Sequence, residues 1–302
     1  MHISRHSFFG ILWATVAIVV WSGSLVMLRL GVTTSLNAYD LTMLRFGIAA
    51  IVLAPVIAKY GIGRPTLPIW GAVAMVILFG APYIVLLSFA MKTAPAAAAG
   101  ALNPGVMAIA SVVISAVVFA NKVDATRAAG LLITAAGIIA FTWTGGSLTP
   151  GHVILIGTGL MWALYAAVVR YFAVPALIAT AIVAVGSAVL FAPLYITVLP
   201  KTISMAPLTD IVTQAVFQGI FVSVAAVYAF NRSAECLGPV TGAVLPALIP
   251  VVTLGLGVIA LGERVNLGAL VSALVVTAGL ALILAGKAIL ERYRVRWARL
   301  RE

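Results

Sequence analysis

Charged side chains are scarce in this sequence: they make up 8% of its 302 residues, whereas 64% of the residues are hydrophobic. Soluble globular chains are about 45–50% apolar and about 25% charged. A soluble domain of this length could not bury so much apolar surface. The composition therefore excludes a soluble globular protein and predicts an integral membrane protein.

Cysteine and histidine are scarcer still. Cys236 is the only cysteine, so the chain can form no intramolecular disulfide and no metal site made of thiolates. The three histidines lie at an end of the chain or in a loop, and no apolar run has a central Asp, Glu or His. Because proton relays through membranes use such groups, the sequence shows no obvious proton-coupling site. We expect no metal ion and no cofactor.

Enzymatic motifs are missing as well. No GxxxxGK[ST] loop occurs, which argues against ATP hydrolysis by this chain. A membrane-embedded enzyme, such as a lipid-modifying one, would need a set of polar catalytic groups at depth, and no such set is visible. The sequence therefore disfavours an enzyme.

Long apolar runs fill most of the chain. A membrane-spanning helix needs about 20 apolar residues, and the runs of that kind predict ten spans. They lie near residues 8–30, 40–59, 68–91, 95–120, 126–144, 152–172, 176–199, 211–231, 237–261 and 267–286.

The basic residues predict an orientation. With both termini in the cytoplasm, 13 of the 18 Lys and Arg residues fall on the cytoplasmic side, as the positive-inside rule requires. Several of them belong to the tail, residues 287–302, which we expect to contact anionic lipid. The net charge of +11 thus indicates orientation and lipid contact rather than nucleic-acid binding.

The chain also contains an internal repeat. A shift of 142 positions places "GALNPG" (100–105) on "GAVLPA" (242–247), so that Pro104 meets Pro246. A shift of 141 places Trp21 on Trp162 and Arg29 on Arg170. We predict a first repeat over residues 1–145 and a second over 146–286. Because each holds an odd number of spans, five, the second enters the membrane from the opposite face, as in many secondary transporters.

The repeated blocks resemble a known family. The stretch "GPVTGAVLPALIPVVTLGLGVIALGERVNLGALVSALVVTAGLALIL" (238–284) is similar to the EamA-like ten-helix exporters of the drug/metabolite transporter superfamily. The Gly-Glu step of that family stands here as Gly262–Glu263, whereas the first repeat has Ala120–Asn121. The opening span, "WATVAIVVWSGSLVMLRLGV", is similar to the aromatic-amino-acid exporter subgroup. This resemblance implies export of amino acids and related metabolites.

Prolines and glycines inside the spans are candidate hinges. A proline removes a backbone donor and frees the carbonyl four residues earlier, and in a membrane such groups must face protein or a watery cavity. Their recurrence in both repeats favours the transport pathway over the alternative that they only shape helix packing. The candidates for hinges or gates are Pro82, Gly100, Pro104, Gly105, Pro246 and Pro250.

Aromatic and polar residues at mid-depth are candidates for the wall of a substrate cavity. Trp21 with Ser24, and Trp162 with Tyr165, are each three residues apart and so share a helix face. Asn103 can bind a substrate or clamp a neighbouring helix, and both alternatives stay open. The further candidates are Tyr83, Gln218 and Tyr228.

Arg45 lies about one turn into the second predicted span. It can extend to the membrane surface, or it can close a gate or contact an anion.

Together these features predict an all-α membrane protein of the bacterial inner membrane. It would export a small molecule, an aromatic or apolar amino acid or a related compound, by alternating access through a central cavity. A nucleotide-sugar or lipid carrier of the same superfamily is the closest alternative, but such anionic cargo would need several deep basic residues. We expect no nucleic-acid partner, and no obligate protein partner is evident.

Overall fold

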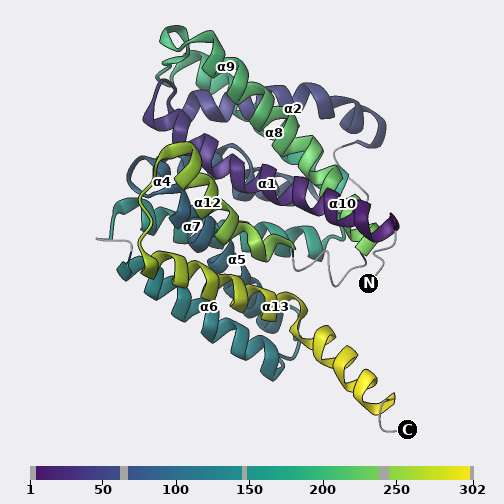
Figure 1. Ribbon diagram of the computed structural model, residues 1–302. Helices are drawn as coiled ribbons and strands as arrows, with labels where there is room; N and C mark the ends of the chain where they lie inside the picture. The colour runs from purple at the N-terminus through teal and green to yellow at the C-terminus, as the bar shows by residue number, and fades with distance from the viewer. Residues whose placement is uncertain (1–4, 62–66, 145–147, 238–244, 300–302) are drawn as a thin grey trace.

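The computed structural model describes residues 5–61, 67–144, 148–237 and 245–299 (Figure 1). Within these ranges the chain is helical and contains no strand. The first repeat holds α1 (Arg5–Thr33), α2 (Ala38–Tyr60), α3 (Ile69–Phe79), α4 (Ala81–Thr93), α5 (Ala96–Val118) and α6 (Ala125–Thr144). The second holds α7 (Pro150–Tyr171), α8 (Ala176–Thr197), η1 (Ile203–Met205), α9 (Leu208–Gln214), η2 (Ala215–Ala225), α10 (Ala226–Leu237), η3 (Leu245–Leu248), α12 (Ile249–Leu261) and α13 (Leu267–Arg299).

Nine helices of the described chain are long and apolar enough to cross a membrane. One further apolar helix, Pro246–Leu261, is shorter. It belongs to the predicted span 237–261, of which residues 238–244 lie outside the described part. The nine or ten apolar helices confirm the prediction of an all-α integral membrane protein.

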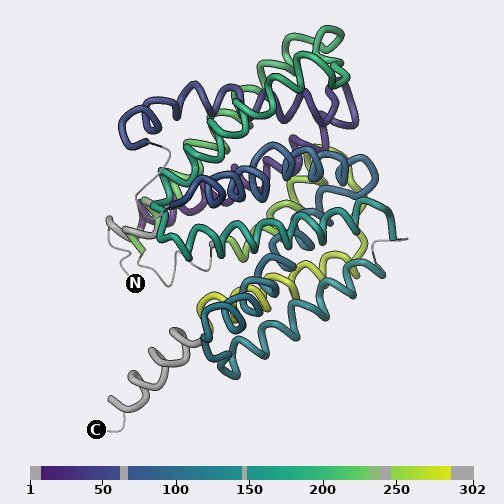
Figure 2. The backbone as a smooth tube through the Cα atoms, turned by 180° about the vertical axis from the view of Figure 1, so that it is seen from behind, coloured from purple at the N-terminus to yellow at the C-terminus, as the bar shows by residue number. Residues whose placement is uncertain are grey.

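The helices lie in three groups. α2 and α8 pack together at one side, and α6 and α13 pack together at the other (Figures 1 and 2). α1, α4, α5, α7, α10 and α12 lie between these pairs (Figure 1). Each repeat thus contributes helices to every group.

Close backbone contact holds α6 and α13 together. A Cβ atom built on Gly130 would lie 2.9 Å from the carbonyl oxygen of Gly279, and one built on Gly279 would lie 2.6 Å from the backbone nitrogen of Thr134. Small residues at such crossings allow helices to approach in a membrane, where lipid is as apolar as leucine.

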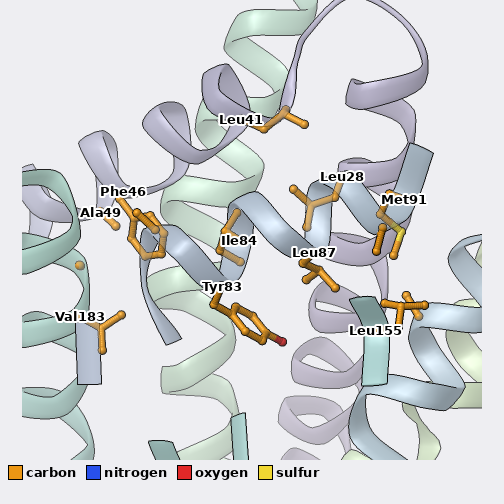
Figure 3. Packing of buried hydrophobic residues seen from close by; sticks show 14 of the residues in the cluster. Leu28, Leu41, Phe46, Ala49, Tyr83, Ile84, Leu87, Met91, Leu155 and Val183 are labelled. Atoms are coloured by element: carbon orange, nitrogen blue, oxygen red, sulfur yellow. The ribbon is translucent and has the colours of Figure 1, made fainter. Parts of the chain in front are cut away.

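The outer face of the bundle is apolar. Ile69, Val117, Trp143 and Ile259 are each at least 79% exposed. In water such a surface would associate, whereas in a bilayer it contacts the acyl chains. The buried residues lie toward the middle of the bundle, where Figure 3 shows Phe46, Tyr83, Ile84 and Leu87 in one cluster.

Candidate functional site

A cavity of about 360 Å³ lies between the α2–α8 pair and the middle group of helices. Small-molecule sites have volumes of about 300–1000 Å³ and occur between the helices of bundles. Both repeats line it, and Trp21 of α1 and its repeat counterpart Trp162 of α7 are both in its wall. Of the residues that the sequence singles out, the structure brings to this cavity Trp21, Ser24, Arg45, Tyr83, Asn103, Pro104, Trp162, Tyr165 and Pro246.

An aromatic cluster forms one wall of the cavity. Phe79 lies at its centre: its ring stacks on Tyr165 with centroids 4.5 Å apart and planes 11° apart. The same ring lies 4.9 Å from the ring of Tyr83 and 5.6 Å from that of Trp162. Elsewhere in the wall, Trp21 lies 5.3 Å from Phe230. Flat aromatic walls of this kind suit a solute with an aromatic or apolar group.

Arg45 contributes a positive charge to the cavity. α2 begins at Ala38, so Arg45 lies about two turns, roughly 10 Å, inside the helix. The sequence-based placement at one turn is therefore too shallow. The side chain lines the central cavity. Its Nη1 donates to the Ser24 hydroxyl at 3.3 Å and to the side-chain carbonyl of Gln218 at 3.1 Å.

Gln218 supports this charge without lining the cavity itself. It is completely buried. Its carbonyl also accepts from the Ser24 hydroxyl at 2.9 Å, and its amide donates to the Ser24 backbone oxygen at 3.0 Å. These bonds join α1, α2 and η2 into one polar cluster, which we call the Arg45 cluster: Ser24, Arg45 and Gln218.

A second polar cluster lies beside the aromatic wall. The Tyr83 hydroxyl donates to the Asn103 side-chain oxygen at 3.0 Å, and the Asn103 amide donates to the Thr158 hydroxyl at 2.7 Å. The side-chain oxygen and the side-chain nitrogen of Asn103 are thus both hydrogen-bonded to protein groups. Asn103 clamps α4, α5 and α7 together while it borders the cavity.

The third predicted span is interrupted beside the cavity. Its two halves, α3 and α4, meet at Gly80, and Pro82 is the second residue of α4. A Cβ on Gly80 would lie 2.1 Å from the Ser187 hydroxyl and 2.3 Å from the Val76 carbonyl oxygen. Ser187 of α8 accepts the freed backbone N–H of Ala81 at 3.0 Å. Broken helices in membranes mark binding sites because their free backbone groups need protein or a cavity beside them.

A π-helix, η2, interrupts the eighth predicted span over Ala215–Ala225. Val222 and Ser223 of this segment line the cavity. π-Helical turns are rare and occur frequently at functional sites.

The remaining candidates lie away from the cavity. Tyr228 was expected in the cavity wall, but it does not line the cavity. It is 55% exposed and packs edge-to-face on Trp13, with ring centroids 5.6 Å apart. The reason is helical phase: the neighbouring Val227 faces inward and lines the cavity instead. A Cβ on Gly100 would lie 2.6 Å from Thr253 of α12, and one on Gly105 would lie 2.8 Å from Ile138 of α6. Both glycines serve close helix packing.

The two repeated proline sites differ. Pro104 lies inside the continuous helix α5, whereas Pro246 lies in the short 3₁₀ turn η3. Pro250, buried at the start of α12, follows one turn later and does not line the cavity.

An ion pair joins α1 to Glu263, which directly follows the C-cap of α12, at one end of the bundle, which we call the Glu263 end. Arg29 Nε lies 3.5 Å from Glu263 Oε1. The same carboxylate accepts the backbone N–H groups of Ala96 at 2.8 Å and Ala97 at 3.4 Å, and so caps the start of α5. Arg29 Nη1 donates in turn to the backbone oxygens of Met91 and Ala94. Four helices are thereby tied together at this end.

The opposite end is hollow. A second hollow of about 530 Å³ shares Pro104, Met107 and Pro246 with the central cavity and extends to Arg170, near the end of α7. We call this the Arg170 end. Its other basic residues at the hollow are Lys122 and Arg127.

Comparison with known proteins agrees with this architecture. The model of the EamA-like transporter family matches residues 8–143 and again residues 149–285. No curated protein matches the chain. Among solved structures, 26 chains match. One of them, described only as "Crystal structure of protein", is 24% identical, with a TM-score of 0.63 over 92% of this chain and 98% of that chain. That likeness shows the fold alone.

The fold and the cavity define a multi-pass membrane protein built from two repeats around a solute-sized space. The family match covers nearly the whole chain, so this protein belongs to the EamA-like transporter family.

Proposed function

We propose that the protein exports amphipathic small molecules, above all aromatic or apolar amino acids and related metabolites or drugs, by alternating access through the central cavity. The observation that carries this proposal is the aromatic wall around Phe79, which both repeats build at mid-depth. Family membership supports transport as the activity.

In this proposal the protein lies in the bacterial inner membrane with both termini in the cytoplasm. The Arg170 end, with its basic residues, would then face the cytoplasm, in agreement with the positive-inside rule. Substrate would enter from the cytoplasm through the second hollow. It would leave after the Arg29–Glu263 contacts separate at the other end.

Pro104, Pro246 and Pro250 are the proposed points of bending. α5 and the η3–α12 segment border both the cavity and the second hollow through Pro104 and Pro246. Bending there would narrow one opening while widening the other. Gly100, Gly105 and Pro82 would guide the motion through the packing and the helix break described above.

A nucleotide-sugar carrier is the alternative within the superfamily. The nucleoside diphosphate group of such a substrate carries more than one negative charge. Arg45 is the one cation among the described residues that line the central cavity. The cavity therefore favours a substrate with at most one negative charge.

Uptake into proteoliposomes tests the proposal. The purified protein is reconstituted, and radiolabelled tryptophan, phenylalanine, methionine and threonine are offered with and without an imposed pH gradient. We expect saturable uptake of the aromatic amino acids that does not require the gradient. Absence of uptake of every amino acid would overturn the substrate assignment, and uptake that depends on the gradient would reveal proton coupling.

A further inference from the structure

We infer that Arg45 binds the anionic group of the substrate, so that the transported class is the aromatic or apolar monocarboxylate, with or without an α-amino group. This inference rests on the function proposed above and makes its substrate class specific. It assigns recognition to the carboxylate and to the apolar body of the substrate, and none to the amine.

The position of Arg45 is the first argument. A charged side chain inside a membrane-spanning segment is unfavourable, and such residues mark substrate or ion pathways. Arg45 lies about two turns inside α2 and lines the central cavity. Its hydrogen bonds to Ser24 and Gln218 hold the guanidinium at that depth. The Arg45 cluster therefore keeps a cation at the cavity wall instead of at a membrane surface.

The second argument is the lack of a compensating negative charge. In the described part of the chain, no carboxylate lies within ion-pair distance of Arg45. Every acidic side chain that the structure describes is engaged elsewhere: Asp40 with Tyr195 and Thr202, Asp124 with Arg127, Asp210 with Ser35, and Glu263 with Arg29. A partly buried cation without a counter-ion attracts an anion more strongly than a cation in water does, because the protein interior screens charge less than water.

The third argument is the donor capacity that remains. A guanidinium has five N–H donors. Two contacts of Arg45 are made by Nη1, both to uncharged oxygens, while Nε is buried and has no hydrogen-bond partner. Ser24 and Gln218 thus fix the orientation of the guanidinium and leave its charge uncompensated. Carboxylates and phosphates are the anions that a guanidinium binds, and a monocarboxylate carries the one negative charge that Arg45 can balance.

The rest of the cavity fits the apolar part of such a substrate. Phe46 lies beside the Arg45 guanidinium, 5.9 Å from its central carbon to the ring centroid, and the Phe79 cluster forms another wall. No described acidic residue lines the cavity, so nothing there offers an ion pair to an ammonium group. Deaminated acids should therefore bind about as well as the amino acids.

Competition binding with a set of related indoles tests the inference. The full-length protein is purified in detergent, and binding of radiolabelled tryptophan is measured against four unlabelled competitors. Tryptophan and indole-3-propionate carry the carboxylate, whereas tryptophanamide and tryptamine lack it. We expect the two carboxylates to compete similarly, and the other two compounds to be at least about tenfold weaker, as for the loss of a charged hydrogen bond.

Variants of Arg45 complete the test. Arg45→Met should weaken tryptophan binding at least about tenfold and bring all four competitors to within about twofold of each other. Arg45→Lys, which keeps the charge if the first variant fails to fold, should retain the order of preference at reduced affinity. Lys59→Met, on the exposed surface of the same helix, is the matched control and should change nothing. Melting temperatures and gel filtration establish that each variant is folded.

The outcomes separate this inference from the proposed function. The assignment of Arg45 is wrong if tryptophanamide or tryptamine competes as well as tryptophan, or if Arg45→Met keeps the preference for carboxylates. The proposed export function would still stand in either case. If no indole binds and no amino acid is transported, both fail. A preference for tryptophan over indole-3-propionate of tenfold or more would contradict the claim that the amine is not recognised.

Discussion

Arg29 and Glu263 form an ion pair at one end of the bundle, and the residues at the corresponding positions of the other repeat cannot form it. The repeat places Arg29 on Arg170 and Glu263 on Asn121. Arg170 and Asn121 instead donate to the same hydroxyl of Ser115, at 3.1 and 2.8 Å. One end thus has an ion pair that ties helices together, whereas the corresponding contact at the other end is to an uncharged hydroxyl beside a hollow.

Glu263→Gln should destabilise the protein. The substitution removes the charge that pairs with Arg29 and weakens the cap on α5, so we expect a loss of about 1–2 kcal/mol in the free energy of unfolding. Thermal melting of the detergent-purified protein measures it. Asp124→Asn is the control, because its pair with Arg127 is 32–43% exposed and exposed pairs contribute about 0–1 kcal/mol. Equal effects of the two substitutions would show that the Glu263 contact has no special role.

Phe79→Leu should weaken binding of aromatic substrates. Leucine keeps most of the apolar volume but removes the ring that stacks on Tyr165 and contacts Tyr83 and Trp162. An aromatic pair between Phe79 and the ring of the substrate would contribute about 0.5–1.5 kcal/mol beyond burial, so the affinity for tryptophan should fall about three- to tenfold. Equilibrium binding of labelled tryptophan measures it. Trp143→Leu, at a ring that is 79% exposed on the outer face, should leave affinity unchanged; a comparable loss there would contradict the site.

Gly80→Ala should destabilise the protein by at least about 2 kcal/mol, because the new methyl group would overlap the Val76 carbonyl oxygen and the Ser187 hydroxyl. Gly157→Ala is the matched control, since a Cβ there meets no atom within 4 Å, and in a helix it should be neutral or stabilising by about 0.5–1 kcal/mol. The melting temperature should therefore fall in Gly80→Ala and stay the same or rise in Gly157→Ala. A harmless Gly80→Ala would mean that the break between α3 and α4 is not tightly enclosed.

Pro104→Ala should slow transport without loss of stability. Alanine restores the backbone donor that proline lacks inside α5 and straightens the helix at the proposed bend. Initial uptake rates in proteoliposomes should fall by about tenfold or more, the effect of about 1.4 kcal/mol on the rate-limiting barrier. Pro55→Ala, at an exposed proline inside α2, is the control and should leave the rate unchanged. Unchanged rates in folded Pro104→Ala would remove this proline from the mechanism.

The sequence predicts the membrane class, the repeats and much of the cavity, for a physical reason. Membrane-spanning helices can be recognised from their length and hydropathy. A duplicated pattern, such as Trp21 with Trp162, indicates positions that lie at the same depth in the two repeats. Tyr83, Asn103 and Arg45 were recognisable because polar groups are rare at that depth. The contacts they make were not, since Thr158 meets Asn103 and Gln218 meets Arg45 across long stretches of chain.

Other features depend on geometry that the sequence does not express. Phe79, the centre of the aromatic wall, is one apolar residue among many, and only the helix break at Gly80 turns it toward Tyr165. The sequence "GAP" at 80–82 contained a signal for that break, and we predicted a hinge there only at Pro82. Tyr228 was misplaced because η2 is π-helical, and the longer turn shifts the face that every later residue presents.

The role of Glu263 also required the structure. Its partner Arg29 is distant in the sequence and lies near the end of another predicted span. The cap on Ala96 and Ala97 arises because α5 begins beside the end of α12, a consequence of helix packing alone.

Cysteine labelling from the two sides of the membrane tests the central claim most directly. Met107 borders both the central cavity and the second hollow, and replacing Cys236 by serine leaves Met107→Cys as the only thiol. In oriented vesicles, an impermeant maleimide should label this thiol from the Arg170 end quickly and from the Glu263 end slowly, and transported tryptophan should protect it from both sides. Labelling from one side alone during active transport, or no protection by a transported substrate, would contradict passage through this cavity.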